Sequence, residues 1–248
     1  MLTKKKLFFF FFLVFFFSLR AIFDGDLGLH LRIGEYIFKT RSLIYNNPFG
    51  LYFNDYPYVY HSWLSQLIIF LIYKISGLYG LNFFYALLSV LTIFVLHKIC
   101  VEKGKAKDSL LILAFLTPFI VFISGLRTRA ITFLFLGVLQ LFLLKIEKGQ
   151  KRLAFLIPFL FAFWVNLHGG FLMGLILLLL WIIFEIIQFK SPAKTLLLFK
   201  ILIASILFCL FNPYGIGVYT QPLKMMTTPA IFKNITDWQP LSAHPTAL

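Results

Sequence analysis

Residues 4–34 read KKKLFFFFFLVFFFSLRAIFDGDLGLHLRIG, and this stretch decides how the chain can fold. Three lysines precede an apolar run, residues 7–23, whose length falls in the range of about 17 to 25 residues that crosses a bilayer. Two carboxylates, Asp24 and Asp26, follow directly at the end of the run. Because a charge at membrane depth is costly, such carboxylates mark either an interface anchor or a working site.

The composition extends this picture to the whole chain. Of the 248 residues, 60% are hydrophobic and 13% are charged, and the mean hydropathy is +0.91. We therefore predict an all-α, polytopic transmembrane bundle that forms a single domain over residues 1–248. The net charge of +14 would favour nucleic-acid binding in a soluble protein, but membrane proteins keep Lys and Arg in loops, so we expect no nucleic-acid partner. The two cysteines lack metal-site spacing, and no metal site follows from them.

Apolar runs divide the chain into about seven predicted membrane helices. A first outer loop, 24–60, contains a short predicted helix over 27–38, and residues 212–248 form a predicted outer tail. Residues 61–76 have polar and apolar sides at helical spacing, with Trp63 near the start, which favours an amphipathic helix in the membrane interface. The predicted membrane helices are 7–23, 78–97, 109–124, 131–145, 153–165, 171–188 and 195–211.

The distribution of basic residues sets the predicted topology. If 61–76 does not cross the membrane, 14 of the 23 basic residues fall on one side, in short segments where the positive-inside rule is strongest. The same choice places the DGD segment and the turns RTR, NLHGG and FNPYG together on the other face. We therefore expect an integral protein of a bacterial-type plasma membrane whose active face points outward.

The first outer loop supplies the predicted catalytic residues. Asp26 and His30 are four residues apart and would lie on one side of a helix. An N-cap role is the alternative for Asp26, since Asp before a helical run satisfies exposed amides, and that role does not exclude catalysis. Asp24 and Asp26 are thus the candidate catalytic pair, and His30 and His61 are candidate substrate-binding residues.

The later outer turns supply further candidates for substrate binding. Arg127 and Arg129 are expected either to snorkel at the interface or to bind phosphate, which guanidinium groups match with rigid pairs of donors. Asn166 and His168 stand in WVNLHGGF, where they either form the turn or contact substrate. In FNPYG we expect first of all a helix stop.

This arrangement resembles the GT-C-fold membrane glycosyltransferases. The shared features are an aspartate just after the first membrane helix, the pattern DxxxHLRxGEYI over 26–37, an amphipathic juxtamembrane helix and a later arginine turn. The nearest likeness is to aminoarabinose-transferase-like and protein O-mannosyltransferase-like enzymes. Those families commonly carry Asp-Glu where this chain has Asp26-Leu27, and they are longer, so a truncated or minimal member is also expected to fit the pattern.

The resemblance implies a reaction. The donor would be a sugar on a polyprenyl phosphate held in the bilayer, and Asp26 would deprotonate the acceptor while Arg127 or Arg129 stabilises the departing phosphate. Asp24 would either repel the charge on Asp26 or share a divalent cation with it. The competing classes are a multi-pass transporter or lipid flippase and an inactive fragment. The sugar, the acceptor and the oligomeric state stay open.

Overall fold

The computed structural model describes residues 4–19, 25–46, 49, 57–124, 128–188 and 191–228. Asp24 and Arg127, both predicted site residues, lie outside the described residues. The described part is helical, apart from turns and one isolated bridge between Asn46 and Pro57. The helices are α1 (Lys4–Ser18), α2 (Leu27–Thr40), α3 (Trp63–Glu102), α4 (Ser109–Ser124), α5 (Arg129–Glu147), the 3-10 helix η1 (Lys151–Phe155), α6 (Leu156–Leu167), α7 (Phe171–Ile187), α8 (Pro192–Cys209) and α9 (Gly217–Thr227).

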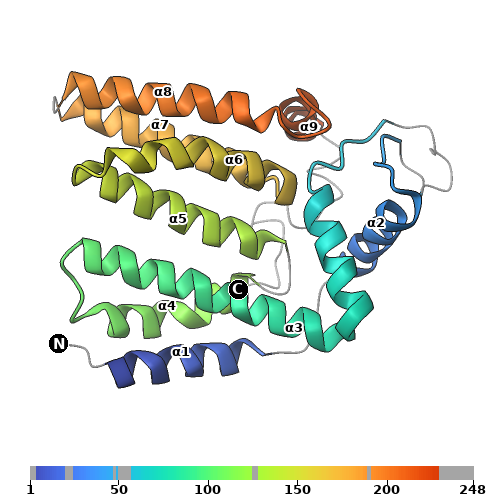
Figure 1. Ribbon diagram of the computed structural model, residues 1–248, viewed down its shortest axis with the longest axis horizontal. Coiled ribbons are helices and arrows are strands. Elements are labelled where there is room, and N and C mark those ends of the chain that lie inside the picture. The colour runs from blue at the N-terminus through green and yellow to red at the C-terminus, as the bar shows by residue number, and fades with distance from the viewer. Residues whose placement is uncertain are drawn as a thin grey trace, which may run out of the picture.

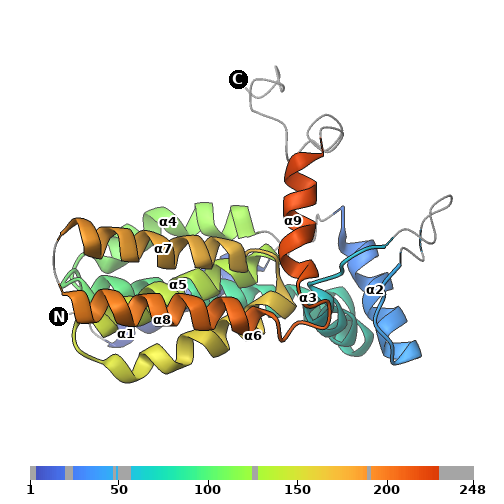
Figure 2. The ribbon, with the colours of Figure 1, turned by 90° about the horizontal axis from the view of Figure 1, so that it is seen from above.

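The helices are arranged as a bundle with one elaborated end. Figure 1 shows α1, the longer part of α3, and α4 to α8 running side by side, with α2 and the start of α3 across one end. Figure 2 shows α9 projecting away from the bundle at that same end. The C-terminal ends of α3, α5 and α7, with the short connections that follow α3 and α5, lie at the opposite end. Within the described part, the predicted outer segments therefore lie at one end of the molecule, and the basic segments after α3 and α5 lie at the other.

A kink at Gly77 makes α3 serve two parts of the fold. Gly77 has φ 62° and ψ −154°, a conformation that favours glycine, and it separates residues 63–76 from residues 78–102. The predicted boundary between an amphipathic helix and a membrane helix falls at this residue. The first part lies across the end of the bundle and the second part runs along it (Figure 1).

Three helices in the described part, α3, α5 and α8, are long and apolar enough to cross a membrane. The apolar helices α4 and α7 are shorter. Large apolar side chains are exposed along α1, α4, α7 and α8, for example Phe8, Leu111, Ile187 and Leu207. Such helices and such a surface are compatible with an integral membrane protein of all-α class.

The core of the bundle is aromatic where α6 meets α7. Trp164 and Phe161 are fully buried and stack with ring centroids 5.6 Å apart. A side chain at Gly174 of α7 would collide with both rings, so the glycine lets α7 approach α6 closely. This packing fixes Trp164 one turn before the end of α6, beside the predicted site residues.

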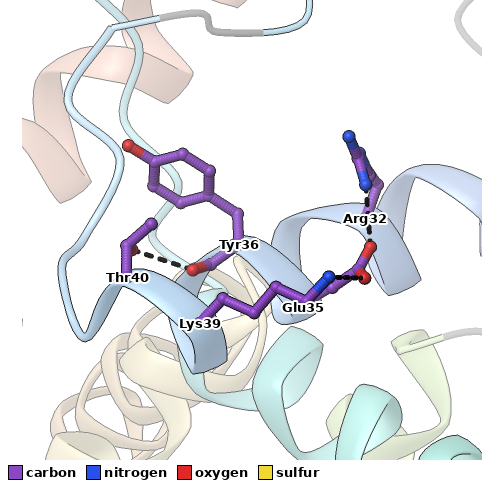
Figure 3. A network of polar contacts seen from close by, with 5 residues as sticks. All are labelled: Arg32, Glu35, Tyr36, Lys39 and Thr40. Carbon is purple, nitrogen blue, oxygen red and sulfur yellow. Dashed lines mark hydrogen bonds and ion pairs between the residues drawn. The ribbon is translucent and has the colours of Figure 1, made fainter.

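The outward face of α2 carries charged side chains. Figure 3 shows Glu35 between two basic partners, with its carboxylate 2.8 Å from Arg32 and 2.6 Å from Lys39. In the same view the Thr40 hydroxyl donates to the Tyr36 carbonyl, as a side chain near a helix end often does. The opposite face of α2 packs against α3, where Gly34 leaves no room for a side chain against the Gln66 carbonyl and Phe70.

Candidate functional site

A pocket of about 550 Å³ opens at the elaborated end of the bundle. Segments far apart in the sequence form its walls: α2, the residues before and at the start of α3, the start of α5, and the turn after α6. Its wall contains five of the predicted site residues, namely Asp26, His30, His61, Arg129 and His168. The fold thus gathers side chains that the sequence separates by up to 142 positions (168 − 26).

Asp26 occupies the position that precedes α2 but does not cap the helix with its side chain. Its backbone carbonyl accepts the first helical hydrogen bond, from His30 N at 3.0 Å, while the carboxylate belongs to the pocket wall. The alternative interpretation of Asp26 as a side-chain N-cap is therefore wrong for this structure. The carboxylate is exposed, where a ligand can reach it.

His30 is oriented by α3. Its Nδ1 lies 3.4 Å from Gln66 Nε2, and Gln66 is only 5% exposed. The close approach of α2 and α3 at Gly34 brings these two side chains together. The wall also contains buried polar atoms that have no hydrogen-bond partner among the described residues, Gln66 Oε1 and Arg129 Nε among them. Buried polar atoms are normally paired, so these two are unsatisfied polar groups next to the pocket.

The turn after α6 holds His168 through its Nδ1 atom. The Gly170 N–H donates to Nδ1 at 3.0 Å, and the Thr132 hydroxyl of α5 lies 2.7 Å from the same atom. Two glycines follow His168 in this turn, Gly169 and Gly170, and neither has a positive φ. Their role is close approach: a Cβ at Gly169 would meet His61 Nε2 at 2.7 Å, and one at Gly170 would collide with Thr132.

Burial lowers the pKa of both inner histidines. For His61, burial is the main cause and a hydrogen bond with the Val59 backbone opposes it. For His168, burial acts first and the nearby positive groups of the two other histidines and Arg129 add to it, which brings the pKa to about 4. Both rings are expected to be neutral near pH 7, so Arg129 is the fixed positive charge of the described wall.

Asn166 lies behind the pocket, and the described wall does not include it. Its Oδ1 accepts hydrogen bonds from Trp63 Nε1 at 2.7 Å and from Asn212 Nδ2 at 3.2 Å. Asn212, which is 3% exposed, also donates to the carbonyls of His61 and Val165. The predicted helix stop FNPYG therefore does more than end α8: its asparagine ties together the segments that carry the pocket histidines.

Several residues that shape the site were not predicted as site residues. Tyr58 and Tyr60 line the pocket with ring centroids 4.4 Å apart, and burial raises the pKa of both phenols. Gln66 belongs to the predicted polar side of 61–76, together with His61 and Ser62, and all three residues line the pocket. The amphipathic pattern of this segment could therefore have indicated Gln66 as a site residue. Thr132 and Trp164 lie within apolar runs, so their polar atoms gave no sequence signal.

A divalent cation was the alternative role for the paired aspartates. Within the described ranges, no group of three His, Cys, Asp or Glu side chains is arranged to hold a metal ion. Because Asp24 lies outside those ranges, the pairing of Asp24 with Asp26 stays a prediction.

No protein-family model, curated protein or solved structure matches this chain. Its class is therefore defined by its own architecture, an all-helical chain with apolar helices of membrane-spanning length and a polar pocket at one end of the bundle.

Proposed function

We propose that the protein is a membrane glycosyltransferase that moves a sugar from a polyprenyl-phosphate donor to an acceptor hydroxyl or amine at the outer membrane face. The observation that carries the proposal is the pocket itself. It places the exposed carboxylate of Asp26 in one wall with Arg129 and three histidines, at the end of an apolar bundle. A carboxylate can accept a proton from the attacking group, and an arginine can stabilise the charge that develops on a departing phosphate.

The proposed reaction is an inverting displacement. The acceptor oxygen or nitrogen forms a bond to the anomeric carbon, and its proton passes to Asp26. The bond between that carbon and the phosphate oxygen breaks, and polyprenyl phosphate leaves with the electron pair. Arg129 stabilises the growing negative charge on the departing phosphate. In this scheme Asp24 and Arg127 assist Asp26 and Arg129, respectively.

The proposed membrane orientation follows the ends of the bundle. Seven helices would cross the bilayer in a GT-C-like arrangement, and the 63–76 part of α3 would lie in the outer interface. Two features support this: the end of α3, the end of α5 and the start of α8, which carry lysines at positions 98–103, 145–148 and 194, lie at the end opposite the pocket (Figure 1), and the 63–76 part lies across the bundle. The pocket would then lie at the depth of lipid phosphates, where a bilayer-anchored donor presents its reacting carbon.

The deciding experiment compares two aspartates. Asp26→Asn keeps the size of the side chain and removes the proton acceptor, so transfer of labelled sugar should fall by about 10²-fold or more. Asp108→Asn is the matched control, because Asp108 is exposed and directly precedes α4 at the opposite end. Transfer is measured in membranes at equal amounts of folded protein. Equal rates for Asp26→Asn and the wild type would remove the base assignment, and no transfer by the wild type with any lipid-linked sugar would favour a transporter or flippase.

A further inference from the structure

The hydrogen bonds of His168 determine which ring nitrogen carries its proton. A backbone N–H is only a donor, so the Gly170 N–H, 3.0 Å from Nδ1, requires Nδ1 to accept. A neutral imidazole has one accepting and one protonated nitrogen. The proton of the neutral His168 ring therefore belongs on Nε2.

Thr132 strengthens this assignment through Trp164. The indole Nε1–H of Trp164 donates to Thr132 Oγ1 at 3.2 Å, since an indole nitrogen is only a donor. Thr132 Oγ1 thus accepts from Trp164 and can give its own proton to His168 Nδ1, 2.7 Å away. Trp164 is fully buried and Thr132 is 8% exposed, so water competes little for these bonds. Two donors converge on Nδ1 and exclude a proton from it.

The other ring nitrogen is the one left for the pocket. His168 belongs to the pocket wall, and its Nδ1 is occupied from behind by α5 and by its own turn. The titratable groups in the described wall are Asp26 and His30 from α2, Tyr58, Tyr60 and His61 from the segment before α3, and Arg129 from α5. A neutral ring in this setting adds a directed N–H donor next to Arg129 without adding a further positive charge.

We propose that His168 binds an oxyanion of the ligand as a neutral hydrogen-bond donor through Nε2–H, and that Thr132 and Trp164 are positioning residues that hold this tautomer. The proposed function identifies the oxyanion as the donor phosphate, and in that respect the inference rests on it. His168 then stabilises charge on a phosphate oxygen and does not accept or release a proton during the reaction. The lowered pKa of His168, about 4, keeps the ring in this form at neutral pH.

The tautomer is tested on the full-length protein by ¹⁵N NMR of its five histidines, with His168→Gln to assign the His168 signals. Protonated and unprotonated ring nitrogens have well-separated ¹⁵N shifts. At pH 7 we expect Nδ1 unprotonated and Nε2 protonated. A Thr132→Val variant leaves the Gly170 N–H as the one remaining donor to Nδ1, so it should show a minor population with the proton on Nδ1, while Thr132→Ser, which keeps the hydroxyl, should match the wild type. A charged ring or a proton on Nδ1 in the wild-type spectrum overturns the inference, whether or not the variants fold.

The ligand is tested with farnesyl phosphate, inorganic phosphate and farnesol. Farnesyl phosphate should shift the Nε2–H signal, and farnesol, which lacks the oxyanion, should not. A response to inorganic phosphate at similar concentration would assign the site to free phosphate, and a much weaker response would assign it to a lipid-linked one. His168→Leu should weaken farnesyl phosphate binding about tenfold or more, and His168→Gln, which keeps an N–H donor, should recover most of it. Equal shifts with farnesol, or unchanged binding in His168→Leu, overturn the oxyanion role.

The two proposals fail in different ways. Sugar transfer by a wild-type protein whose His168 carries its proton on Nδ1 would remove this inference and leave the glycosyltransferase proposal. The expected tautomer and phosphate response without transfer of any lipid-linked sugar would keep the oxyanion site and remove the glycosyltransferase proposal.

Discussion

The two ends of the bundle hold their loops in different ways. At the end opposite the pocket, ion pairs connect the helix ends: Lys148 lies 2.8 Å from Glu102, and Lys194 lies 2.9 Å from Glu185. At the pocket end, neutral groups join distant segments of the described part, for example the amide of Asn212 with the His61 carbonyl. In an ion pair, the two opposite charges largely compensate each other. Neutral hydrogen bonds can hold the pocket wall in place without a charged partner for Arg129, so its positive charge can act on a ligand. This difference is expected if the pocket end binds a charged ligand, as we propose, and the other end only supports the fold.

The largest expected effect comes from the buried ion pair. Glu185 is 2% exposed, so Lys194→Ala would leave its carboxylate buried without the charge partner that lies 2.9 Å away. We expect a loss of about 3–5 kcal/mol in the free energy of unfolding, measured by denaturant titration in detergent. The double variant Glu185→Met with Lys194→Met should recover most of this loss, because it removes both charges. A double variant as unstable as the single one would show that this end depends on packing and not on charge pairing.

A second prediction concerns pH at the pocket end. The pKa of His168 falls from 6.5 to about 4 on folding, mainly through burial, so the unfolded chain binds this proton more tightly. The contribution to stability is full above pH 6.5 and is lost as the pH falls toward 4. The difference between wild type and His168→Gln should therefore change by about 3 kcal/mol between pH 7 and pH 4, with the wild type losing more. A difference independent of pH would contradict a buried neutral ring.

A third prediction tests the neutral network. Asn212→Ala removes the donor to the His61 and Val165 carbonyls, and it leaves buried carbonyl groups unpaired. We expect a loss of about 1–3 kcal/mol, together with changed NMR signals of His61 and His168. Tyr219→Phe is the control, since it removes an exposed hydrogen bond to the Ile206 carbonyl and a weak one with the Cys209 thiol, leaves the His61 and Val165 carbonyls paired, and should change stability less. If Asn212→Ala leaves the histidine signals unchanged, Asn212 ends α8 without organising the pocket.

The contrast between the ends also separates what the sequence predicts from what it does not. Helix positions follow from apolar runs: the predicted helix 109–124 coincides with α4, and 171–188 differs from α7 by one residue. Asp26 directly precedes α2 and His30 lies in its first turn, so their spacing alone predicted that both lie on one side, and both line the pocket. Thr132 and His168 are 36 residues apart on different elements, and only the packing of α5 against α6 brings them into contact. No local pattern encodes such a pair, because its register depends on buried shapes such as that of Trp164.

The smallest expected effect on stability comes from the exposed ion pairs of Glu35 on α2. Its dependence on pH has the same sign as that of His168, since both groups make the fold less stable at low pH. Hydrogen bonds from Lys39, and then from Arg32, lower the pKa of Glu35, because they favour its charged form. The stability that Glu35 contributes is therefore present above its ordinary pKa of 4.5 and is lost as the pH falls through the lowered value. Burial acts on His168 by the opposite route, since it disfavours the charged form, yet both groups destabilise the fold on acidification. The two pH effects differ in size, because water and salt screen side chains such as Arg32 and Lys39, which are 65% and 66% exposed.

Glu35→Gln should accordingly leave the unfolding midpoint at pH 7 unchanged within error. A drop comparable to that of Lys194→Ala would show that α2 is held to the pocket end by charge, and the distinction between the two ends would then fail.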